Sequence, residues 1–202
     1  MIVQTVAAGK LNEIRNQLNL RGFEYQLVCN ANLNYAVLDK AVNFIIAINY
    51  SSDLNYPSSV AKALKQPHFN HSKISKDNFS IGFAIGMWNA NGLFIFVLQS
   101  DIMFLGSSAV RDHFRGWRKI LFHHIIQEAY LKRSDLYLVS AHDVIHCCKP
   151  KMKPKCVPES WINIYDKTAE YFDMEQVEIS TSINIQPYRY GPNHFVNSFY
   201  KK

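Results

Sequence analysis

The chain has 202 residues, of which 48% are hydrophobic and 13% aromatic, so it can bury a normal core and is not a disordered chain. No stretch of about 18 residues is continuously apolar, and the start lacks a basic segment before a long apolar one, so we expect neither a transmembrane helix nor a signal peptide. The formal charge of +6 favours a polyanionic partner, such as an anionic cofactor, an acidic substrate or nucleic acid.

The first third of the chain predicts short strands alternating with helices. FIIAINY at residues 44–50 is rich in β-branched residues and indicates a buried strand. Leu11, Ile14 and Leu18 share one helical face, and Gly22 is a stop signal after them. We predict strands at residues 2–6, 23–28 and 44–50, helices at 9–20 and 57–64, and a polar loop at 66–78.

A hairpin is predicted in the middle of the chain. Two apolar segments at residues 81–88 and 93–99 flank the sequence Asn89-Ala90-Asn91-Gly92. A turn rich in Asn and ending in Gly accommodates the positive φ that a tight hairpin turn needs.

The last half of the chain alternates strands and helices. We predict strands at residues 102–110, 135–140, 177–185 and 194–200, and helices from the basic connector to about 131 and at 158–172. A strand–helix–strand unit over residues 102–140 implies a right-handed crossover and a local parallel pair. The predicted fold class is therefore α/β or α+β, as one domain over residues 1–202 with a mixed sheet and helices packed on it.

An anion site is predicted where the segment 102–110 leads into the next helix. The apolar face of that helix is formed by Leu121, Ile125, Ile126, Ala129 and Tyr130. The connector and the helix start carry Arg111, Arg115, Arg118 and Lys119. The first N–H groups of a helix are unpaired, and its macrodipole adds about half a positive charge there. The sequence therefore favours binding of a phosphate group at this position.

This pattern resembles the GCN5-related N-acetyltransferases. In that family a central strand ends in Val, an Arg-Gly pair follows five and six residues later, and a helix then packs under the acyl-CoA pyrophosphate; here Val110 precedes Arg115-Gly116 at that offset. The family also has a late helix of the type A-x-x-x-Y-x-K-x-G-F, and this chain carries Tyr165 and Lys167 in a comparable segment. The resemblance covers residues 81–185, and residues 1–75 match nothing that we can place.

Three positions depart from the family pattern. Arg118 and Ile120 stand where the family usually has small residues, mostly glycines that allow the backbone to approach the pyrophosphate closely. Asp112 stands where a proline is common. A long side chain at position 118 either blocks that approach or supplies a cation in place of a backbone donor.

The resemblance implies a mostly antiparallel sheet with one parallel strand pair, helices on both faces, and acetyl-CoA or another acyl-CoA as co-substrate. Transfer to an amine acceptor would go by direct attack on the thioester, whose carbonyl a backbone N–H at the splayed end of the strand 102–110 would polarise. The implied cofactor-binding residues are Ala109, Val110, Arg115, Gly116, Trp117, Arg118 and Lys119.

The same resemblance implies that Tyr165 is the general acid near the sulfur, although an aromatic on an amphipathic helix is also a normal packing residue. The general base stays open among four candidates. We rank Asp101 and Asp143 first because both lie near predicted strand ends, where a cleft would open; the other two are Glu128 and His142.

Two other functions stay open. A noncatalytic basic module on the same fold would contact nucleic acid or a protein partner through its basic segments, such as KPKMKPK at residues 149–155. A thiol or metal chemistry would use His142, His146, Cys147, Cys148 and Cys156. Their spacing fits no standard zinc site, so we predict no metal, and cysteine use of this kind indicates a reducing, cytoplasmic environment.

Overall fold

The computed structural model describes seven parts of the chain, and all structural statements concern them: residues 26–29, 42–50, 56–64, 79–100, 107–147, 155–179 and 185–191. The predicted elements at residues 2–6, 9–20, 66–78 and 194–200 lie outside these parts.

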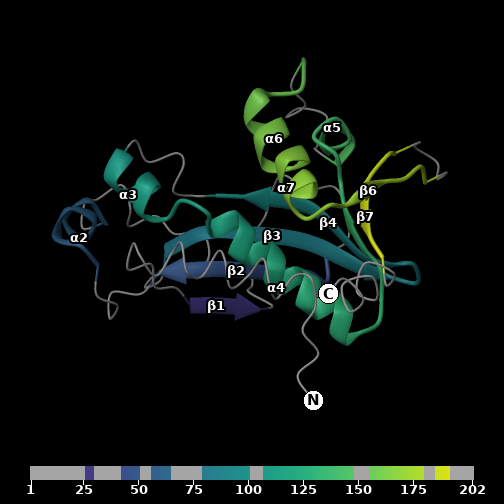
Figure 1. The fold of residues 1–202 in the computed structure, drawn as a ribbon, viewed down its shortest axis with the longest axis horizontal. Coiled ribbons are helices and arrows are strands. Elements are labelled where there is room, and N and C mark those ends of the chain that lie inside the picture. The colour runs from purple at the N-terminus through teal and green to yellow at the C-terminus, as the bar shows by residue number, and fades with distance from the viewer. Residues whose placement is uncertain are drawn as a thin grey trace, which may run out of the picture.

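The described strands form one seven-stranded mixed sheet in the order β1-β2-β3-β4-β5-β7-β6 (Figure 1). Every neighbouring pair is antiparallel except β4 and β5, which run parallel. The predicted mixed sheet with one parallel pair is thus confirmed. The strands are β1 (Gln26–Cys29), β2 (Phe44–Tyr50), β3 (Phe79–Asn89), β4 (Gly92–Gln99), β5 (Leu136–Leu138), β6 (Glu175–Gln176) and β7 (Tyr188–Tyr190).

The described helices are few and mostly short. They are α2 (Ser58–Leu64), α3 (Ser108–His113), α4 (Trp117–Leu131), α5 (Val144–Cys147), α6 (Glu159–Ile164) and α7 (Asp166–Tyr171). α4 crosses the sheet over β2 and β3, and α6 and α7 lie at its β4 side (Figure 1). In the part of the chain that the structure describes, no helix has the length and apolar character needed to cross a bilayer.

The predicted hairpin is confirmed and joins β3 to β4. Asn89 pairs with Gly92 across the turn, and the Asn91 N–H donates to the Asn89 side chain over 2.8 Å. Gly92 has φ 137°, which non-glycine residues rarely adopt, and the next N–H, that of Leu93, donates to the Asp135 carbonyl at 2.9 Å. The turn therefore also fixes the start of the parallel pair.

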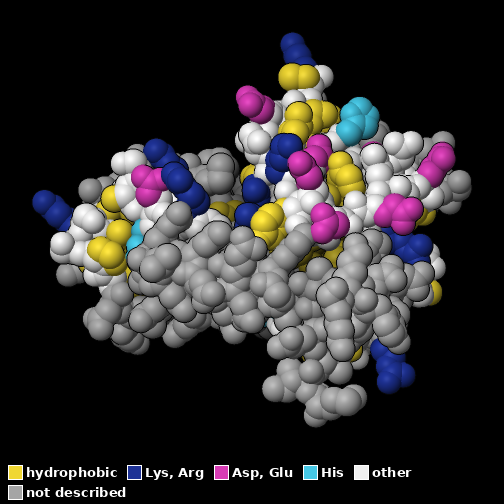
Figure 2. Space-filling model, viewed as in Figure 1, with side chains coloured by type: hydrophobic (Ala, Val, Ile, Leu, Met, Phe, Trp, Pro, Cys, Tyr) yellow, Lys and Arg dark blue, Asp and Glu magenta, His cyan; other side chains and the backbone are white. Residues whose placement is uncertain are grey.

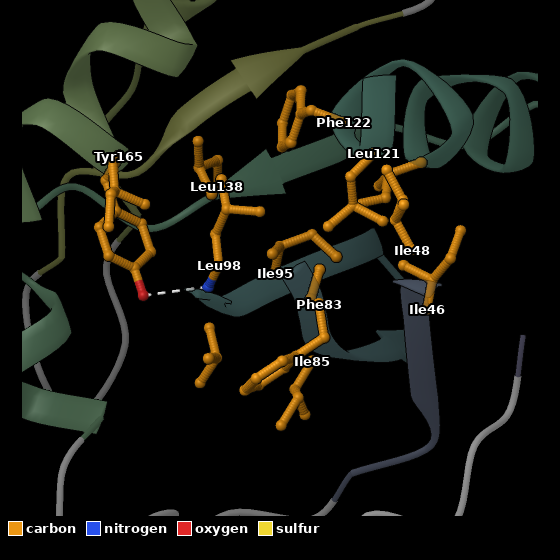
Figure 3. Close-up of a cluster of buried hydrophobic side chains, with 14 of the residues drawn as sticks. Ile46, Ile48, Phe83, Ile85, Ile95, Leu98, Leu121, Phe122, Leu138 and Tyr165 are labelled. Atoms are coloured by element: carbon orange, nitrogen blue, oxygen red, sulfur yellow. Dashed lines mark hydrogen bonds between the residues drawn. The ribbon is translucent and has the colours of Figure 1, made fainter. Parts of the chain in front are cut away.

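The core lies between α4 and the sheet. Four residues of the predicted apolar face of α4, namely Leu121, Ile125, Ile126 and Ala129, are buried, whereas Tyr130 is only half-buried. Leu121 points toward Ile48 and Ile95 of the sheet (Figure 3), and Phe122 belongs to the same buried cluster, with its ring near that of Phe172. The spacing of apolar residues predicts the buried face of α4 correctly, because a helix that covers a sheet needs one apolar stripe.

Two predicted elements are wrong. Residues 108–110 were expected to end a strand but belong to α3, and residues 101–106 lie outside the described parts. The Ser107 hydroxyl, which accepts from the Val110 N–H at 3.5 Å, caps this helix at its start. The second is the strand predicted at 177–185, of which residues 177–179 and 185 are described. Ile179 forms an isolated antiparallel bridge with Ile185, so the two described ends of that segment lie side by side and not at opposite ends of one strand.

Candidate active site

The parallel partner of β5 is β4, not the predicted segment 102–110. Leu93, Phe94 and Ile95 pair with Leu136, Tyr137 and Leu138, and the Val139 N–H adds a last bond to the Ile95 carbonyl at 3.2 Å. β4 continues to Gln99, whereas β5 ends at Leu138. The edge of β4 from Phe96 onward therefore has no β5 partner, and we call this gap between the two strands the wedge.

The Tyr165 hydroxyl fills the wedge. Its oxygen accepts from the Leu98 N–H at 3.1 Å and lies 3.5 Å from the Phe96 carbonyl, to which it donates (Figure 3). Leu98 is aligned with Ala84 of β3, and its N–H donates to Tyr165 instead of to β3. Tyr165 is 5% exposed, and Leu98 is 1% exposed. A buried backbone donor and a buried hydroxyl thus meet beyond the point where the pairing of the parallel strands ends.

Local structure holds Tyr165 at the junction of two helices. The predicted single helix over 158–172 is divided into α6 and α7, with Tyr165 between them. The Tyr165 N–H donates to the Trp161 carbonyl at 2.8 Å, and the Ala169 N–H donates to the Tyr165 carbonyl at 3.0 Å. The Asp166 carboxylate accepts from the Ala141 N–H at 2.9 Å, which ties the start of α7 to the loop after β5. This tie, together with the bond of Thr168 Oγ1 to the Ile164 carbonyl, accompanies the break in the helix.

The predicted phosphate loop is the turn between α3 and α4. Gly116 has φ 96° and is the N-cap of α4, so the Arg-Gly pair does carry a left-handed residue there. The Trp117 N–H donates to the Phe114 carbonyl at 3.1 Å, so part of the donor set is used within the turn. Among the described residues, no bond is shown for the N–H groups of Gly116 and Arg118. Two first-turn donors are therefore available at the start of a helix of 15 residues.

Positive charge surrounds this turn. Arg111 and Arg115 are exposed, and Arg115 forms an exposed ion pair with Asp112 at 2.7 Å. Lys and Arg side chains lie over α3 and beside α6 on the face that Figure 2 shows. Burial lowers the pKa of Arg118, whose side chain turns toward α6. An open depression beside α3, lined in part by Val60, Ala109 and Arg115, adjoins the turn.

The other predicted site residues are dispersed. Ala109 and Val110 lie in α3, and Val110 is fully buried, so neither is at a strand end. Trp117 is buried against β3, and Lys119 places its ammonium 3.5 Å from the centre of the Tyr171 ring. Asp101 lies outside the described residues.

Asp143 lies at the end of the β5 segment, as predicted, but within a hydrogen-bonded loop. Its Oδ2 accepts from the Ser140 hydroxyl at 2.8 Å and from the Gln186 N–H at 2.8 Å, and the residue is 4% exposed. These bonds connect the loop after β5 to the segment before β7. The role of Asp143 as general base stays a prediction, and in that role its carboxylate would have to take up a proton while it accepts the bonds from Ser140 and Gln186.

The cysteine and histidine segment brings no ligand set together in the part of the chain that is described. No group of three or more His, Cys, Asp or Glu side chains is placed to hold a metal ion among those residues. Cys156 is a free and exposed thiol. The side chains of His146, Cys147 and Cys148 lie outside the description.

Sequence reasoning missed Leu98, Asp166 and the contact of Arg118 with α6. Leu98 contributes a backbone N–H, which no side-chain pattern reports. Comparison of the chain with known protein families, curated proteins and solved structures finds no match, so the function has to be argued from the geometry.

Proposed function

We propose that the protein is an acyl-CoA-dependent N-acyltransferase of the GCN5-related type, which transfers an acyl group to an amine. The observation that carries the proposal is the wedge, where the Leu98 N–H and the Tyr165 hydroxyl meet at 3.1 Å just beyond the paired residues of the parallel strands β4 and β5. Acyl transfer needs a donor for the thioester oxygen and an acid for the departing thiolate. The wedge contains one group of each kind.

The Leu98 N–H is the donor in this proposal. A carbonyl oxygen in the wedge would accept this N–H in place of Tyr165, and the bond would strengthen as negative charge develops on that oxygen. The strand is fixed by β3 on its other side, so the donor needs no reorganisation. The amine nitrogen would bond to the thioester carbon as the C–S bond breaks, and the displaced Tyr165 hydroxyl would give its proton to the departing sulfur. The proton that the amine nitrogen loses would then restore the phenol.

The start of α4 suits the pyrophosphate of the co-substrate. Gly116 holds the left-handed conformation there, and the N–H groups of Gly116 and Arg118 are available within the described residues. Ile120 is fully buried, so it points into the core and not over the helix start. The Arg118 guanidinium is engaged with the Asn163 carbonyl. The side chains at positions 118 and 120 are therefore compatible with an anion at this turn.

Titration calorimetry with acetyl-CoA and with free CoA, at about 50 mM and about 200 mM salt, tests the proposal. We expect micromolar binding of both ligands that persists at the higher salt, because backbone donors and buried contacts are screened less than exposed charges. An amine screen on protein that binds would then identify an acceptor. No binding of either ligand, or binding that disappears with salt, would remove the proposal.

Tyr165→Phe separates chemistry from binding. We expect it to lower kcat by about 100-fold, the lower end of what general acid catalysis contributes, with the acetyl-CoA Kd changed less than about threefold. Tyr171→Phe is the matched control, since Tyr171 is an aromatic of α7 that contacts Lys119 rather than the wedge. Equal turnover of wild type and Tyr165→Phe would return Tyr165 to a packing role.

A specific observation also favours the second candidate, a noncatalytic basic module. Tyr165 already satisfies the Leu98 N–H, and a residue used only for packing would do the same. The exposed side chains of Arg111, Arg115 and Lys155 would then serve a polyanion such as nucleic acid. Binding of an oligonucleotide that weakens steeply with salt, combined with no binding of acetyl-CoA, is the result that selects this function.

A further inference from the structure

We infer that Arg118 is a positioning residue, which holds the last turn of α6 so that the Tyr165 hydroxyl stays in the wedge, on the Leu98 N–H in the free protein and beside it when a substrate carbonyl takes that N–H. The inference rests on the proposed function and extends it to a residue that occupies a usual glycine position. In this inference the Arg118 side chain acts on the position of Tyr165 and does not bind the pyrophosphate of the co-substrate.

The contact that carries the inference joins α4 to α6. Arg118 is the second residue of α4, and its Nη1 donates to the backbone carbonyl of Asn163. Asn163 belongs to the last turn of α6, two residues before Tyr165. The last carbonyls of a helix lack partners within the helix, and a cation is favoured next to them. Arg118 therefore caps α6 from a neighbouring helix.

The bond from Arg118 to Asn163 is important because the Arg118 side chain is partly buried. The side chain is half-buried, and its Nε is buried with no hydrogen-bond partner among the described residues. A partly desolvated cation is costly unless it is hydrogen-bonded, and its burial also lowers its pKa. The bond to Asn163 compensates part of that cost, so the guanidinium and the end of α6 hold each other in place.

α4 also holds the segment after Tyr165. The ammonium of Lys119 lies 3.5 Å from the centre of the Tyr171 ring, and the rings of Phe122 and Phe172 are 5.3 Å apart. Arg118 thus fixes the chain before Tyr165, while Lys119 and Phe122 fix the chain after it. The two sets of contacts come from adjacent turns of one helix, whose start is the proposed phosphate site. A ligand at that start and the hydroxyl in the wedge therefore share one rigid support.

Hydrogen exchange at single amides, followed by NMR on the full chain, tests the inference without any need for activity. The variants are Arg118→Met, which keeps length and loses the donors, and Arg118→Lys, which keeps one charged donor. We expect Arg118→Met to speed exchange of the Leu98 amide about tenfold relative to the Val139 amide, which bonds to Ile95 and not to Tyr165. Arg118→Lys should recover most of the protection.

Lys132→Met is the matched control, because it removes a cation at the other end of α4 that contacts Trp88 of β3 and neither α6 nor α7. It should leave the ratio of Leu98 to Val139 exchange within about twofold of wild type. An unchanged ratio in Arg118→Met would overturn the inference. So would equal acceleration of both amides that Arg118→Lys fails to recover, since that pattern reports a general loss of stability.

The kinetic arm links the inference to the proposed reaction. In active protein we expect Arg118→Met to lower kcat about tenfold with the acetyl-CoA Kd within about threefold, and Arg118→Lys to restore kcat. A weaker Kd with unchanged kcat would assign Arg118 to the phosphate and overturn the inference. If the wild type binds no acetyl-CoA, the proposed function fails, and the exchange ratio still decides whether Arg118 places Tyr165.

Discussion

Gly82 of β3 leaves the space that the indole of Trp117 occupies. A Cβ built on Gly82 would overlap the ring at Cε3 and Cζ3 of Trp117. Trp117 is the first residue of α4 and is buried, so this contact fixes the start of the helix on the sheet. The proposed phosphate site is thus positioned by the absence of a side chain on a strand 35 residues earlier in the chain.

Gly82→Ala should destabilise the fold by about 1 to 3 kcal/mol, because the overlap is with a bulky ring that cannot turn away without leaving the core. Urea unfolding measures the change in the free energy of unfolding. Gly191→Ala is the matched control, since a Cβ there meets its nearest atom at 3.5 Å and the residue has no positive φ. It should change the stability by less than about 0.5 kcal/mol.

The second expectation concerns coupling. In the double variant Gly82→Ala with Trp117→Leu, the smaller side chain removes the overlap. The loss of unfolding free energy in the double variant should therefore be smaller, by at least about 0.5 kcal/mol, than the sum of the losses in the two single variants. Strict additivity would show that the strain of Gly82→Ala lies elsewhere than at Trp117.

The parts of the fold that the sequence predicts well are those determined by neighbours in the chain. The Asn89–Gly92 turn and the apolar face of α4 depend on local backbone geometry and on periodicity, and both are confirmed. The segment 102–110 was predicted as a strand because short apolar runs do not distinguish strand from helix. Ser107 at the start of α3 was the signal that a helix begins there.

The candidate site was predictable only in part. Gly116 was predicted as a turn residue from the Arg115-Gly116 pair before the helix, and its left-handed conformation agrees with that turn. Tyr165 was identified by resemblance, but its partner is a backbone N–H 67 residues away. Such a contact depends on how far β5 extends beside β4, which no local pattern reports. The bond from Arg118 to Asn163 spans 45 residues and is hidden for the same reason.

Asp143→Asn should reveal whether Asp143 is a base or a structural residue. Its Oδ2 accepts bonds from the Ser140 hydroxyl and from the Gln186 N–H, and the neutral oxygen of a side-chain amide accepts both bonds more weakly than a carboxylate does. We expect a loss of about 1 to 3 kcal/mol in unfolding free energy, with kcat of the surviving folded protein within about threefold of wild type. A loss of kcat by about 100-fold at unchanged stability would make Asp143 the general base.

The stability should fall at high pH partly through Tyr188. Burial, the charge and hydrogen bond of Asp166, and the charge of Asp143 together raise the pKa of Tyr188 to about 12. Because the folded pKa lies above the ordinary value of about 10, the folded state holds this proton more tightly than the unfolded chain does. The contribution is therefore complete below pH 10 and is lost as the pH rises through 12.

Tyr188→Phe removes this titration. At pH 8 the variant should be less stable than wild type because it lacks the hydrogen bond to Asp166, and this difference should shrink steadily as the pH rises from about 10 to about 12. Urea unfolding at pH 8, 10 and 11.5 measures the difference. Burial and the charge of Asp173 also raise the pKa of Tyr190 to about 12, so wild type should lose stability relative to Tyr190→Phe in the same range. A difference that stays constant with pH in both variants would show that neither phenol keeps its proton more tightly in the folded state.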